Sequence, residues 1–497
     1  MKYTLAIDQG SHSSRAIIYD ENGALVDHQS KPVTLFRNKN GFIEHEPLEI
    51  LDSINTVLDL LFASLSSDVY DNIVTCGLAC QRSTVLACTK QGEPLSPAIS
   101  WQDVRGASYL ESLPLATKQV RDLSGLPVSP HYAASKCRWL LENQPKVKAV
   151  PRDNLCLSPL SSFLLFHLLK NSKFVVDHTQ AQRMQLMNIE SLDWSEKLAN
   201  AFQITMNLLP ACKPVCDDYG LLKNTHIPVT AVCGDQNAAL FGSGPMNEET
   251  ALINLGSGAF ILRLLPTLKK SGELLTGIAC SSKNKTLYMR EGTVNGAGNA
   301  VEWFLNKYPL ADWKEHLPVW LDQINQPPVF INTVGGVGSP WWLHDIEPCF
   351  IHEKTGLDEQ ASVSAKAVAV IESIVFLLQD NLNIMNQEQR LSLLKVSGGL
   401  SQLDGLCQKL ANLSQIPVKR MVDKEATALG IARLTNGCHM STSDQTEQFD
   451  TYFEPDEKSK NKDLLERYQT FRSYLIKRDL CKKDMTDKNG LNIPDSP

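Results

Sequence analysis

The sequence has little excess charge of either sign, and this excludes whole classes of partner. It contains 48 Lys plus Arg against 55 Asp plus Glu, which gives a net charge of −7 and an isoelectric point near 5.9. We therefore expect no basic surface that would attract a nucleic acid or an anionic membrane. A site that handles phosphate has to rely on backbone N–H groups, a metal ion and a few Arg or Lys side chains.

The sequence also lacks an apolar run of membrane-spanning length. The longest candidate, near residues 160–169, is interrupted by Ser161, Ser162 and His167. Strand-like sequence begins at residue 3, so we expect neither a signal peptide nor a transit peptide. The 13 cysteines are odd in number and scattered, which is typical of reduced thiols. These absences favour a cytoplasmic protein without a membrane partner.

Two cysteine pairs have a spacing that would suit a metal site, Cys76 with Cys80 and Cys212 with Cys216. Neither pair has a matching His or Cys nearby in the sequence. We interpret all four as free thiols packed in the core.

The length of 497 residues exceeds what one hydrophobic core usually serves. We expect two large domains, residues 1–245 and residues 246–478, with one last helix over residues 464–476. From residue 479 the sequence is rich in Lys and Asp and poor in apolar residues. The tail 479–497 is therefore predicted to be disordered.

The stretch around Asp235 lies near the middle of the chain and organises the interpretation of the rest. Thr230 and Val232 favour a strand, and an apolar run from Ala238 favours a helix, so Asp235 is predicted at a strand-to-helix junction. Junctions of this kind carry the working residues of α/β sheets. A carboxylate held there can accept a proton from a substrate hydroxyl or help to hold a metal ion. The structural alternative is that Asp235 only caps the helix.

Two segments repeat the pattern of strand, Gly-Ser turn and strand. Residues 3–20 contain the turn at Gly10 and Ser11, and residues 251–263 contain the turn at Gly256 and Ser257. Such turns offer backbone N–H groups to a phosphate, and Asp8 at the strand end can hold Mg²⁺ through water. Each alone could be an ordinary hairpin at a sheet edge. One at the start of each half indicates a duplicated fold that clamps a nucleotide.

The first half also carries side chains that suit a polyol or a sugar. Arg82 follows a predicted strand, and Gln102, Asp103 and Arg105 follow the aromatic Trp101. Planar donors for hydroxyls beside an aromatic wall are typical of sugar sites. The alternative is a set of surface ion pairs next to a core tryptophan.

The second half has three glycine-rich turns, at residues 292–298, 335–338 and 397–401. Paired glycines between a buried strand and the predicted helix 403–413 let a ligand approach the backbone, and adenosine is a suitable ligand there. Residues 426–434 form a predicted helix of small residues, which suits close packing behind such a site.

Taken in order, these stretches resemble the FGGY family of carbohydrate kinases over nearly the whole chain, and most closely its glycerol kinase branch. The matching segments are residues 8–15, 41–47, 81–82, 101–103, 234–236, 256–258, 397–399 and 428–430. The resemblance implies a duplicated actin-like (ribonuclease H-like) α/β fold with two domains around a central cleft. It also implies transfer of the γ-phosphoryl group of ATP, with Mg²⁺, to a small polyol or sugar.

The resemblance also assigns roles to individual residues. Asp235 matches the general base, and Asp8 with Asp235 matches the Mg²⁺ site. The acceptor-binding positions are Arg82, Ser83, Trp101, His131, Asp235 and Gln236. The ATP-binding positions are Gly10, Ser11, His12, Ser13, Arg15, Gly256, Ser257, Gly296, Gly298, Gly398, Gly399, Leu400 and Leu403. A homodimer or homotetramer is also implied.

Two positions depart from the glycerol kinase pattern, which carries Glu where this chain has Ser83 and Tyr where it has His131. Losing a carboxylate that binds substrate hydroxyls can shift discrimination by orders of magnitude. A kinase of a four- or five-carbon sugar alcohol or ketose, such as xylulose or ribulose, therefore stands beside a kinase of glycerol. A third interpretation is a nucleotide-binding regulatory protein without transfer chemistry; the presence of Asp8 and Asp235 disfavours it.

Overall fold

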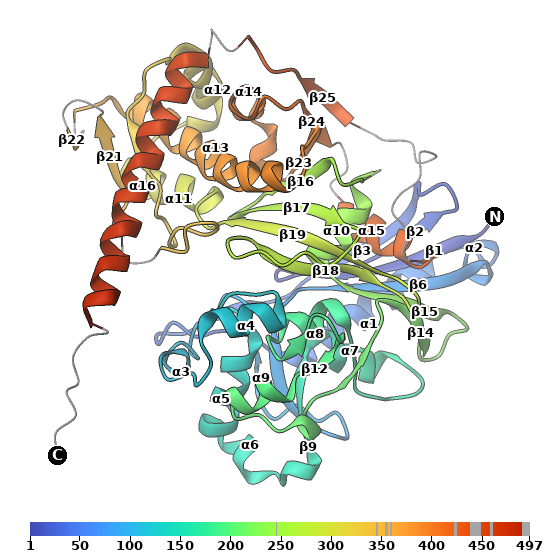
Figure 1. Cartoon of the computed structure of the whole chain (residues 1–497). Helices are drawn as coiled ribbons and strands as arrows, with labels where there is room; N and C mark the ends of the chain where they lie inside the picture. The colour runs from blue at the N-terminus through green and yellow to red at the C-terminus, as the bar shows by residue number, and fades with distance from the viewer. Residues whose placement is uncertain are drawn as a thin grey trace, which may run out of the picture. The chain divides into compact units, whose positions relative to one another are not determined.

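The chain forms two compact units in the computed structural model, which describes residues 1–244, 246–343, 346–352, 356–357, 360–421, 425–437, 449–457 and 461–489 (Figure 1). The first unit comprises Met1–Asn247, Leu264–Met289 and Glu425–Glu447, and the second comprises Glu248–Arg263, Arg290–Lys424 and Gln448–Pro497. Short segments of the second half of the chain are thus grouped with the first unit. The domain boundary expected at residues 245 and 246 stays a prediction.

A six-stranded sheet with the order β14-β15-β6-β1-β2-β3 carries the first unit. Its strands are β1 (Tyr3–Gln9), β2 (Ser13–Asp20), β3 (Leu25–Pro32), β6 (Ile73–Cys80), β14 (Cys216–Leu221) and β15 (Pro228–Gly234). Strand β6 runs parallel to both β1 and β15, and it pairs Cys80 with Gln9 on one side and with Gly234 on the other. The carboxyl ends of the three strands therefore meet at one edge of the sheet, where α/β proteins build their sites.

Helix α1 (Pro47–Ser64) packs on this sheet beside β2 and β3. Its buried residues Ile50, Ile54, Val57 and Leu61 recur every three or four positions, so one face of the helix is apolar. The predicted hairpin over residues 3–20 is confirmed.

A smaller sheet with the order β4-β5-β8-β7-β9 forms the rest of the first unit together with short helices. Its strands are β4 (Phe36–Arg37), β5 (Ile43–His45), β7 (Val85–Thr89), β8 (Ala98–Ile99) and β9 (Leu155–Pro159). The helices are α2 (Ser67–Asp71), α3 (Ser108–Glu111), α4 (Thr117–Ser124), α5 (Ala133–Asn143), α6 (Pro145–Ala149), α7 (Leu160–Leu168), α8 (His178–Arg183) and α9 (Glu196–Ala201). The pairs β10 (Val175–Asp177) with β13 (Ala211–Lys213) and β11 (Met187–Asn188) with β12 (Asp193–Trp194) connect them.

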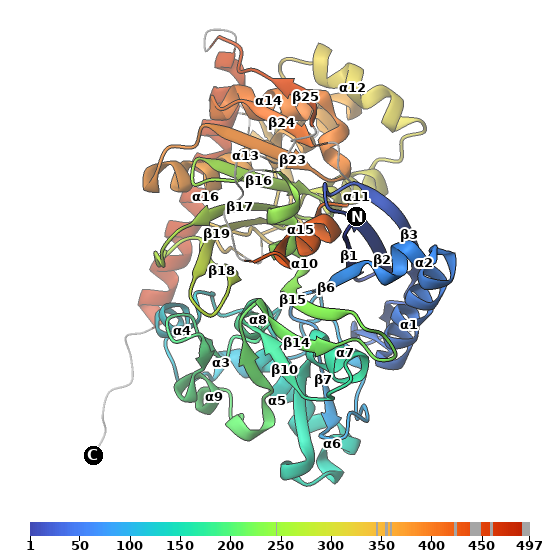
Figure 2. The same ribbon diagram turned by 90° about the vertical axis from the view of Figure 1, so that its right-hand side faces the viewer.

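Helices α10 (Asp235–Gly242) and α15 (Ala426–Leu434) lie against each other in the first unit (Figure 2). A Cβ on Gly242 would come within 1.8 Å of the Ala426 carbonyl oxygen, and one on Gly430 within 1.8 Å of the Ala238 carbonyl oxygen. The two backbones therefore touch at positions where any side chain would collide with them. Residues 426–434 form the predicted helix of small residues, and this helix packs closely against the helix that begins with Asp235. Its place behind an adenosine site stays a prediction.

The second unit is built on a sheet with the order β18-β19-β17-β16-β23-β24-β25. Its strands are β16 (Thr250–Leu255), β17 (Ala259–Leu265), β18 (Leu275–Ser281), β19 (Thr286–Val294), β23 (Leu393–Ser397), β24 (Val418–Met421) and β25 (Phe449–Phe453). Strand β18 and the adjoining ends of β17 and β19 are grouped with the first unit. A small sheet, β20 (Val329–Ile331), β21 (Cys349–His352) and β22 (Gly356–Leu357), lies beside α13 (Val363–Glu388).

The pairing of the second sheet repeats that of the first. Strand β16 is antiparallel to β17 and parallel to β23, β23 is parallel to β24, and β24 is antiparallel to β25. In the first sheet β1, β2, β6, β15 and β14 have the same relations in the same order. The duplicated α/β fold expected from the two Gly-Ser hairpins is therefore confirmed.

Helix α13 is long and apolar enough to cross a membrane by length and composition, and 89% of its apolar window is buried. The core helix of a folded domain passes the same test. The run near residues 160–169, taken from the sequence as the longest apolar candidate, is thus not the longest. The remaining helices of this unit are α11 (Gly298–Lys307), α12 (Trp313–Gln323), α14 (Asp404–Ser414) and α16 (Lys462–Asn489).

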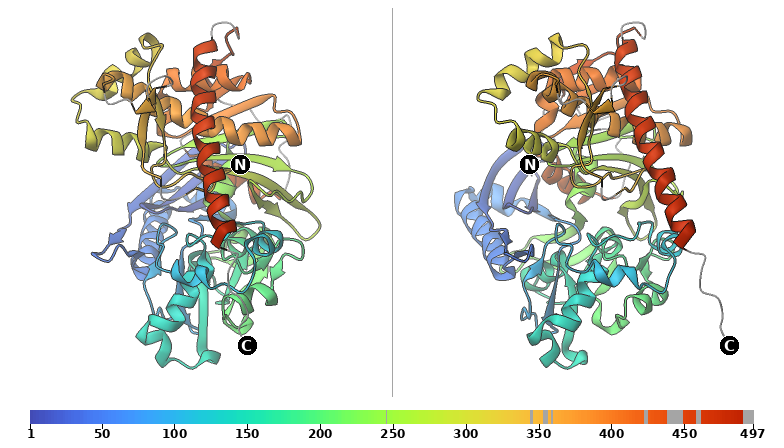
Figure 3. Two further views of the ribbon diagram at one scale, coloured as in Figure 1. Left: turned by 60° about the vertical axis from the view of Figure 1, so that its left-hand side comes forward. Right: turned by 90° about the vertical axis from the view of Figure 1, so that its left-hand side faces the viewer.

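Helix α16, red in Figure 3, is longer than the sequence predicts. Leu464, Tyr468, Phe471 and Leu475 are buried at helical spacing, and the helix packs on α13 and α14. The backbone is helical as far as Asn489, and the disorder expected from residue 479 stays a prediction. Lys and Asp do not interrupt a helix that buried residues have already started. Residues 490–497 lie outside the described residues.

Candidate active site

Asp235 is the first residue of α10 and follows directly on β15. The N-cap of the helix is Gly234, and no side chain caps the helix there. One carboxylate oxygen of Asp235 accepts a 2.7 Å hydrogen bond from the backbone N–H of Gln236, and the side chain is 24% exposed. The predicted strand-to-helix junction is confirmed, whereas the alternative of Asp235 as the helix N-cap is wrong.

Arg82 approaches this carboxylate from the turn after β6. Its Nε lies 3.9 Å from Asp235 Oδ1, and a terminal nitrogen donates to Asn237 Oδ1 at 3.2 Å. The Arg82 side chain is 9% exposed and lies against Gly234, where a Cβ would come within 2.8 Å of it. Gly234 thus lets the positively charged guanidinium lie beside the Asp235 carboxylate.

Gln236 leaves a polar atom unused at the same place. Its Oε1 is buried and accepts no hydrogen bond from any residue that the structure describes. A buried acceptor without a donor costs about 1–3 kcal/mol. A hydroxyl of a bound molecule would remove that cost, so the first turn of α10 combines an anchored carboxylate with an acceptor for a hydroxyl.

Trp101 follows β8 and contacts the turn between β1 and β2. Its indole nitrogen donates to Ser11 Oγ at 3.0 Å, and the residue is 37% exposed. Its backbone N–H donates to Thr84 Oγ1, which in turn donates to Gln81 Oε1 at 2.7 Å. The Nδ1 atom of His131 lies 3.3 Å from the Trp101 carbonyl oxygen. The alternative of a core tryptophan is therefore wrong, because part of the residue is open to solvent.

Asp103 and Arg105, which follow Trp101, do not line an open polyol site as predicted. Both oxygens of Asp103 accept from Arg105, at 2.9 and 2.7 Å, and Asp103 also accepts from the backbone N–H of Ile43 at 2.7 Å. The Arg105 guanidinium lies 3.9 Å above the Phe42 ring and donates to Glu44 at 2.7 Å. The side chains of Asp103 and Arg105 are 0% and 2% exposed. They are a buried structural pair and do not face a polyol.

Asp8 lies near the end of β1, opposite Arg15 on β2. Its carboxylate forms a 2.9 Å ion pair with Arg15, whose other terminal nitrogen donates to both oxygens of Glu425 at 2.8 and 2.5 Å. Burial raises the pKa of Asp8 from 3.8 to about 7; Arg15 lowers it, while the carboxylates of Asp235 and Glu425 raise it. A cation beside Asp8 would restore its ionised form.

In the turn after Asp8, a backbone N–H group is already hydrogen-bonded within the turn itself. The backbone N–H of Gly10 bonds the Ser13 carbonyl at 2.9 Å, and the His12 carbonyl accepts from Val33 at 2.9 Å. The Gly10 N–H is therefore part of the turn and is not a donor aimed outward. The hydroxyl of Ser11 faces Trp101 as described above.

In the second unit, the turn between β16 and β17 is joined to the start of α11. The backbone N–H groups of Gly298 and Asn299 each donate at 2.9 Å, to the carbonyl oxygens of Gly256 and Ser257 respectively. A Cβ on Gly298 would lie 2.9 Å from the Gly256 oxygen, and one on Gly296 would lie 2.4 Å from the Asn332 amide oxygen. These two glycines are thus required by close packing.

The glycine pair after β23 lies beside the same turn, because Ser397 pairs with Asn254 in the parallel ladder. Gly398 has a φ of +92°, and a Cβ on it would lie 2.6 Å from the Leu255 carbonyl oxygen. A Cβ on Gly399 would meet nothing within 4 Å. Leu400 lies in the short 3-10 helix that follows, and Leu403 is the N-cap of α14. The predicted ATP-binding positions of the second half are therefore neighbours, with open space over Gly399.

Comparison with known proteins decides the family. The N-terminal domain of the FGGY family of carbohydrate kinases matches residues 3–242, and the C-terminal domain of that family matches residues 251–436. The chain belongs to the FGGY family. It is 31% identical to a glycerol kinase of Limosilactobacillus reuteri over 481 residues, covering 91% of this chain and 95% of that protein.

Solved structures agree with this membership. The glycerol kinase of Plasmodium falciparum with ADP superposes with a TM-score of 0.85 at 25% identity, covering 96% of this chain and 98% of that one. A ligand-bound xylulose kinase from Lactobacillus acidophilus gives a TM-score of 0.84 at 21% identity, covering 97% and 98%. At that identity the second match supports the actin-like fold of the FGGY kinases alone.

Two residues of this FGGY kinase are missed by the sequence reasoning. Glu425 directly precedes the small-residue helix α15, and only the fold brings it to Arg15 across 410 residues of sequence. The Asn237 side chain accepts a hydrogen bond from Arg82 and donates one to the Ile278 carbonyl at 2.6 Å. These two bonds fix the position of the Arg82 guanidinium. Its position two residues after Asp235 is the signal that could have identified it.

Proposed function

We propose that this FGGY kinase transfers the γ-phosphoryl group of ATP to a hydroxyl of a small polyol or sugar, with Asp235 as the general base. The observation that carries the proposal is the meeting of Asp8, Arg82 and Asp235 at the carboxyl ends of β1, β6 and β15. A buried carboxylate, a guanidinium and a second, partly exposed carboxylate at one sheet edge suit phosphoryl transfer to an alcohol.

The role of Asp235 follows from its surroundings. Its carboxylate is held at one oxygen by the Gln236 N–H and lies 3.9 Å from Arg82 Nε, so it is oriented beside a positive charge. An acceptor hydroxyl within hydrogen-bond distance would lose its proton to Asp235 as the new P–O bond forms. Gln236 Oε1 would accept a hydrogen bond from a second hydroxyl of the acceptor and so orient the first hydroxyl toward Asp235.

Asp8 and Asp235 would hold Mg²⁺ together with the phosphates of ATP. Among the described residues no group of three or more His, Cys, Asp or Glu side chains could hold a metal ion. That suits Mg²⁺, which commonly takes one or two carboxylates and completes its shell with water and phosphate oxygens. When bound, the ion neutralises charge on the transferred group.

This proposal keeps two classes of acceptor, a small glycerol-like polyol and a longer sugar alcohol or ketose. Ser83 and His131 replace the Glu and Tyr of the glycerol kinase pattern, and a hydroxyl in place of a carboxylate leaves more room and one charge fewer. A four- or five-carbon sugar alcohol or ketose, such as xylulose or ribulose, suits that change better. A regulatory protein without transfer chemistry is the remaining candidate.

The test is release of ADP from Mg²⁺-ATP against glycerol, erythritol, ribitol, xylitol, xylulose, ribulose and gluconate, with Asp235→Ala in parallel. An acceptor-dependent rate that the variant loses by about 10²–10⁴-fold is expected, because general-base catalysis contributes that much. ADP binding, measured by calorimetry, should change far less than the rate in the variant. Asp322→Asn, an exposed aspartate on α12, is the matched control. Equal rates in wild type and Asp235→Ala would contradict the proposal.

A further inference from the structure

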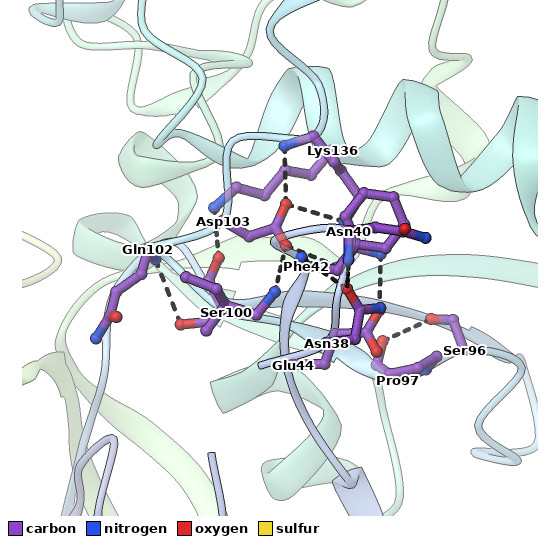
Figure 4. Close-up of polar contacts among 12 residues, drawn as sticks. Asn38, Asn40, Phe42, Glu44, Ser96, Pro97, Ser100, Gln102, Asp103 and Lys136 are labelled. Atoms are coloured by element: carbon purple, nitrogen blue, oxygen red, sulfur yellow. Dashed lines mark hydrogen bonds and ion pairs between the residues drawn. The ribbon is translucent and has the colours of Figure 1, made fainter. Parts of the chain in front are cut away.

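Lys136 lies in the first turn of α5, and its side chain is completely buried. Its ammonium donates three hydrogen bonds to backbone carbonyl oxygens: Ser100 at 2.8 Å, His131 at 2.9 Å and Ser83 at 3.4 Å. Figure 4 shows the contact with Ser100. No carboxylate of the described residues forms an ion pair with it. The three N–H donors of one ammonium are thus matched by three carbonyl groups.

A lysine in this position is costly, because an ammonium loses its hydration when it is buried. Burial lowers the pKa of Lys136 from 10.5 to about 7; the charge of Asp103 opposes the shift, and that of Arg105 adds to it. A methionine of similar length would fill the same space without a charge. A methionine there could not donate the three hydrogen bonds that the ammonium makes.

The three carbonyl groups belong to three separate segments of the predicted acceptor site. Ser83 is itself a predicted acceptor-binding residue and follows Arg82, Ser100 precedes Trp101, and His131 is the third. Ser83 has a φ of +62°, a left-handed conformation that residues with a side chain rarely adopt. The Ser83 carbonyl group therefore points in a direction that the backbone would rarely take without a hydrogen-bond partner such as Lys136.

We propose that Lys136 is a positioning residue for the acceptor: its ammonium sets the mutual spacing of Ser83, Trp101 and His131 without touching the acceptor. This inference rests on the proposed function, because it assigns a role within the acceptor site of the kinase. Lys136 acts through three backbone segments, so its loss would misplace several acceptor contacts at once. The ATP-binding positions of the second unit have no contact with it among the described residues.

The experiment measures acceptor KM, ATP KM and kcat for wild type, Lys136→Met and Lys136→Arg, with the best acceptor of the panel. Lys136→Met should raise the acceptor KM about ten- to hundredfold, because a misplacement of about 1 Å can cost that much. The ATP KM should stay within about twofold, since uniform loss of structure would raise both constants. Lys136→Arg keeps the charge and should recover part of the acceptor affinity.

A pH series separates positioning from packing. Asp103, Arg105 and Cys137 are the charged or titratable groups that face the ammonium. As the pH rises through about 7, wild type should lose the charge of Lys136 and its acceptor KM should rise, while the ATP KM does not follow. Lys136→Met should have a high acceptor KM at every pH, and Lys136→Arg should show no rise.

Lys366→Met is the matched control, because Lys366 is a lysine 5% exposed on α13 that lies 5.4 Å from the Tyr308 ring. It should change thermal stability without shifting the acceptor KM. An unchanged acceptor KM in folded, active Lys136→Met overturns the inference. If that variant fails to fold, a Lys136→Arg enzyme with the pH profile of wild type overturns it instead. If the wild-type enzyme is inactive toward every acceptor, the proposed kinase function fails together with the inference about Lys136. If the wild-type enzyme is active and only the Lys136 variants behave unexpectedly, the inference alone fails.

Discussion

The indole nitrogen of Trp101 donates a 3.0 Å hydrogen bond to the hydroxyl of Ser11. Trp101 is a predicted acceptor-binding residue, and Ser11 lies in the turn predicted to bind phosphate. One hydrogen bond therefore joins the two predicted halves of the reaction within the first unit. Because Trp101 is 37% exposed, this contact is open to change when a ligand binds.

We expect Trp101 and Ser11 to be energetically coupled. Trp101→Phe keeps an aromatic ring but removes the donor, and Ser11→Ala removes its acceptor, so each should weaken acceptor binding. The double variant should be no worse than the poorer single variant, with a coupling of about 1 kcal/mol, or roughly fivefold in kcat/KM. Steady-state kinetics of the four proteins measures this coupling. Strictly additive effects would show that the hydrogen bond has no role in the reaction.

Competition between protons and Mg²⁺ at Asp8 gives a second prediction. Burial raises the pKa of Asp8 to about 7, so at lower pH the carboxyl is protonated and cannot hold a cation. The fall of kcat/KM on the acidic side of the pH profile, its acidic limb, should therefore move to lower pH as the Mg²⁺ concentration rises. Glu425→Gln should move it in the same direction, because the Glu425 carboxylate raises the pKa of Asp8.

Rates across about pH 5.5–8 at several Mg²⁺ concentrations measure this limb, with KCl holding the ionic strength constant. Potassium alone should leave the limb in place. A limb that ignores Mg²⁺ would mean that Asp8 does not hold the metal.

The difference between Asp235 and Asp103 shows what sequence can predict about this site. Strand-forming residues before Asp235 and an apolar run after it are local signals, so the junction follows from sequence alone. Asp103 and Arg105 have the residue types of a polyol site, yet their side chains are almost fully buried against Phe42 and Ile43. Burial depends on which distant segments fold over a residue, and no local pattern contains it.

Contacts over long sequence separations were out of reach for the same reason. Arg15 and Glu425 are 410 residues apart, and the carbonyls gathered by Lys136 come from three loops. The duplication could be predicted, because the Gly-Ser hairpins repeat a visible pattern. The end of α16 could not, because Lys and Asp suit both an exposed helix and a disordered tail.

Asp177 should make the protein less stable as the pH rises. It is buried, its Oδ1 accepts from the backbone N–H groups of Thr179 and Gln180, and its Oδ2 has no partner among the described residues. Burial raises its pKa from 3.8 to about 7, against the lowering by these hydrogen bonds. The folded state therefore binds more protons than the unfolded state between those values, and stability falls as the pH rises through that window.

Asp177→Asn keeps an oxygen for the two N–H groups and removes the charge. It should be more stable than wild type at pH 8 by up to a few kcal/mol, and about equal to it near pH 4. Urea unfolding at the two pH values measures the difference. Asp8 has the same direction of shift, so some slope should survive in the variant. A variant that is less stable than wild type at pH 8 would contradict the assignment.

The contact between α10 and α15 should control activity as well as stability, because α10 begins with Asp235. A Cβ on Gly430 would lie 1.8 Å from the Ala238 carbonyl oxygen, a backbone atom that cannot turn aside. Gly430→Ala should therefore separate the helices, cost about 1–3 kcal/mol or more, and lower kcat by displacing the Asp235 carboxylate. Gly272→Ala is the matched control, since a Cβ there meets nothing within 4 Å and the residue has no positive φ. Thermal melting measures the effect on stability, and kcat at a temperature where both variants are folded measures the effect on activity. If Gly430→Ala lowers the melting temperature but keeps the wild-type kcat, α15 supports the fold without fixing the position of Asp235.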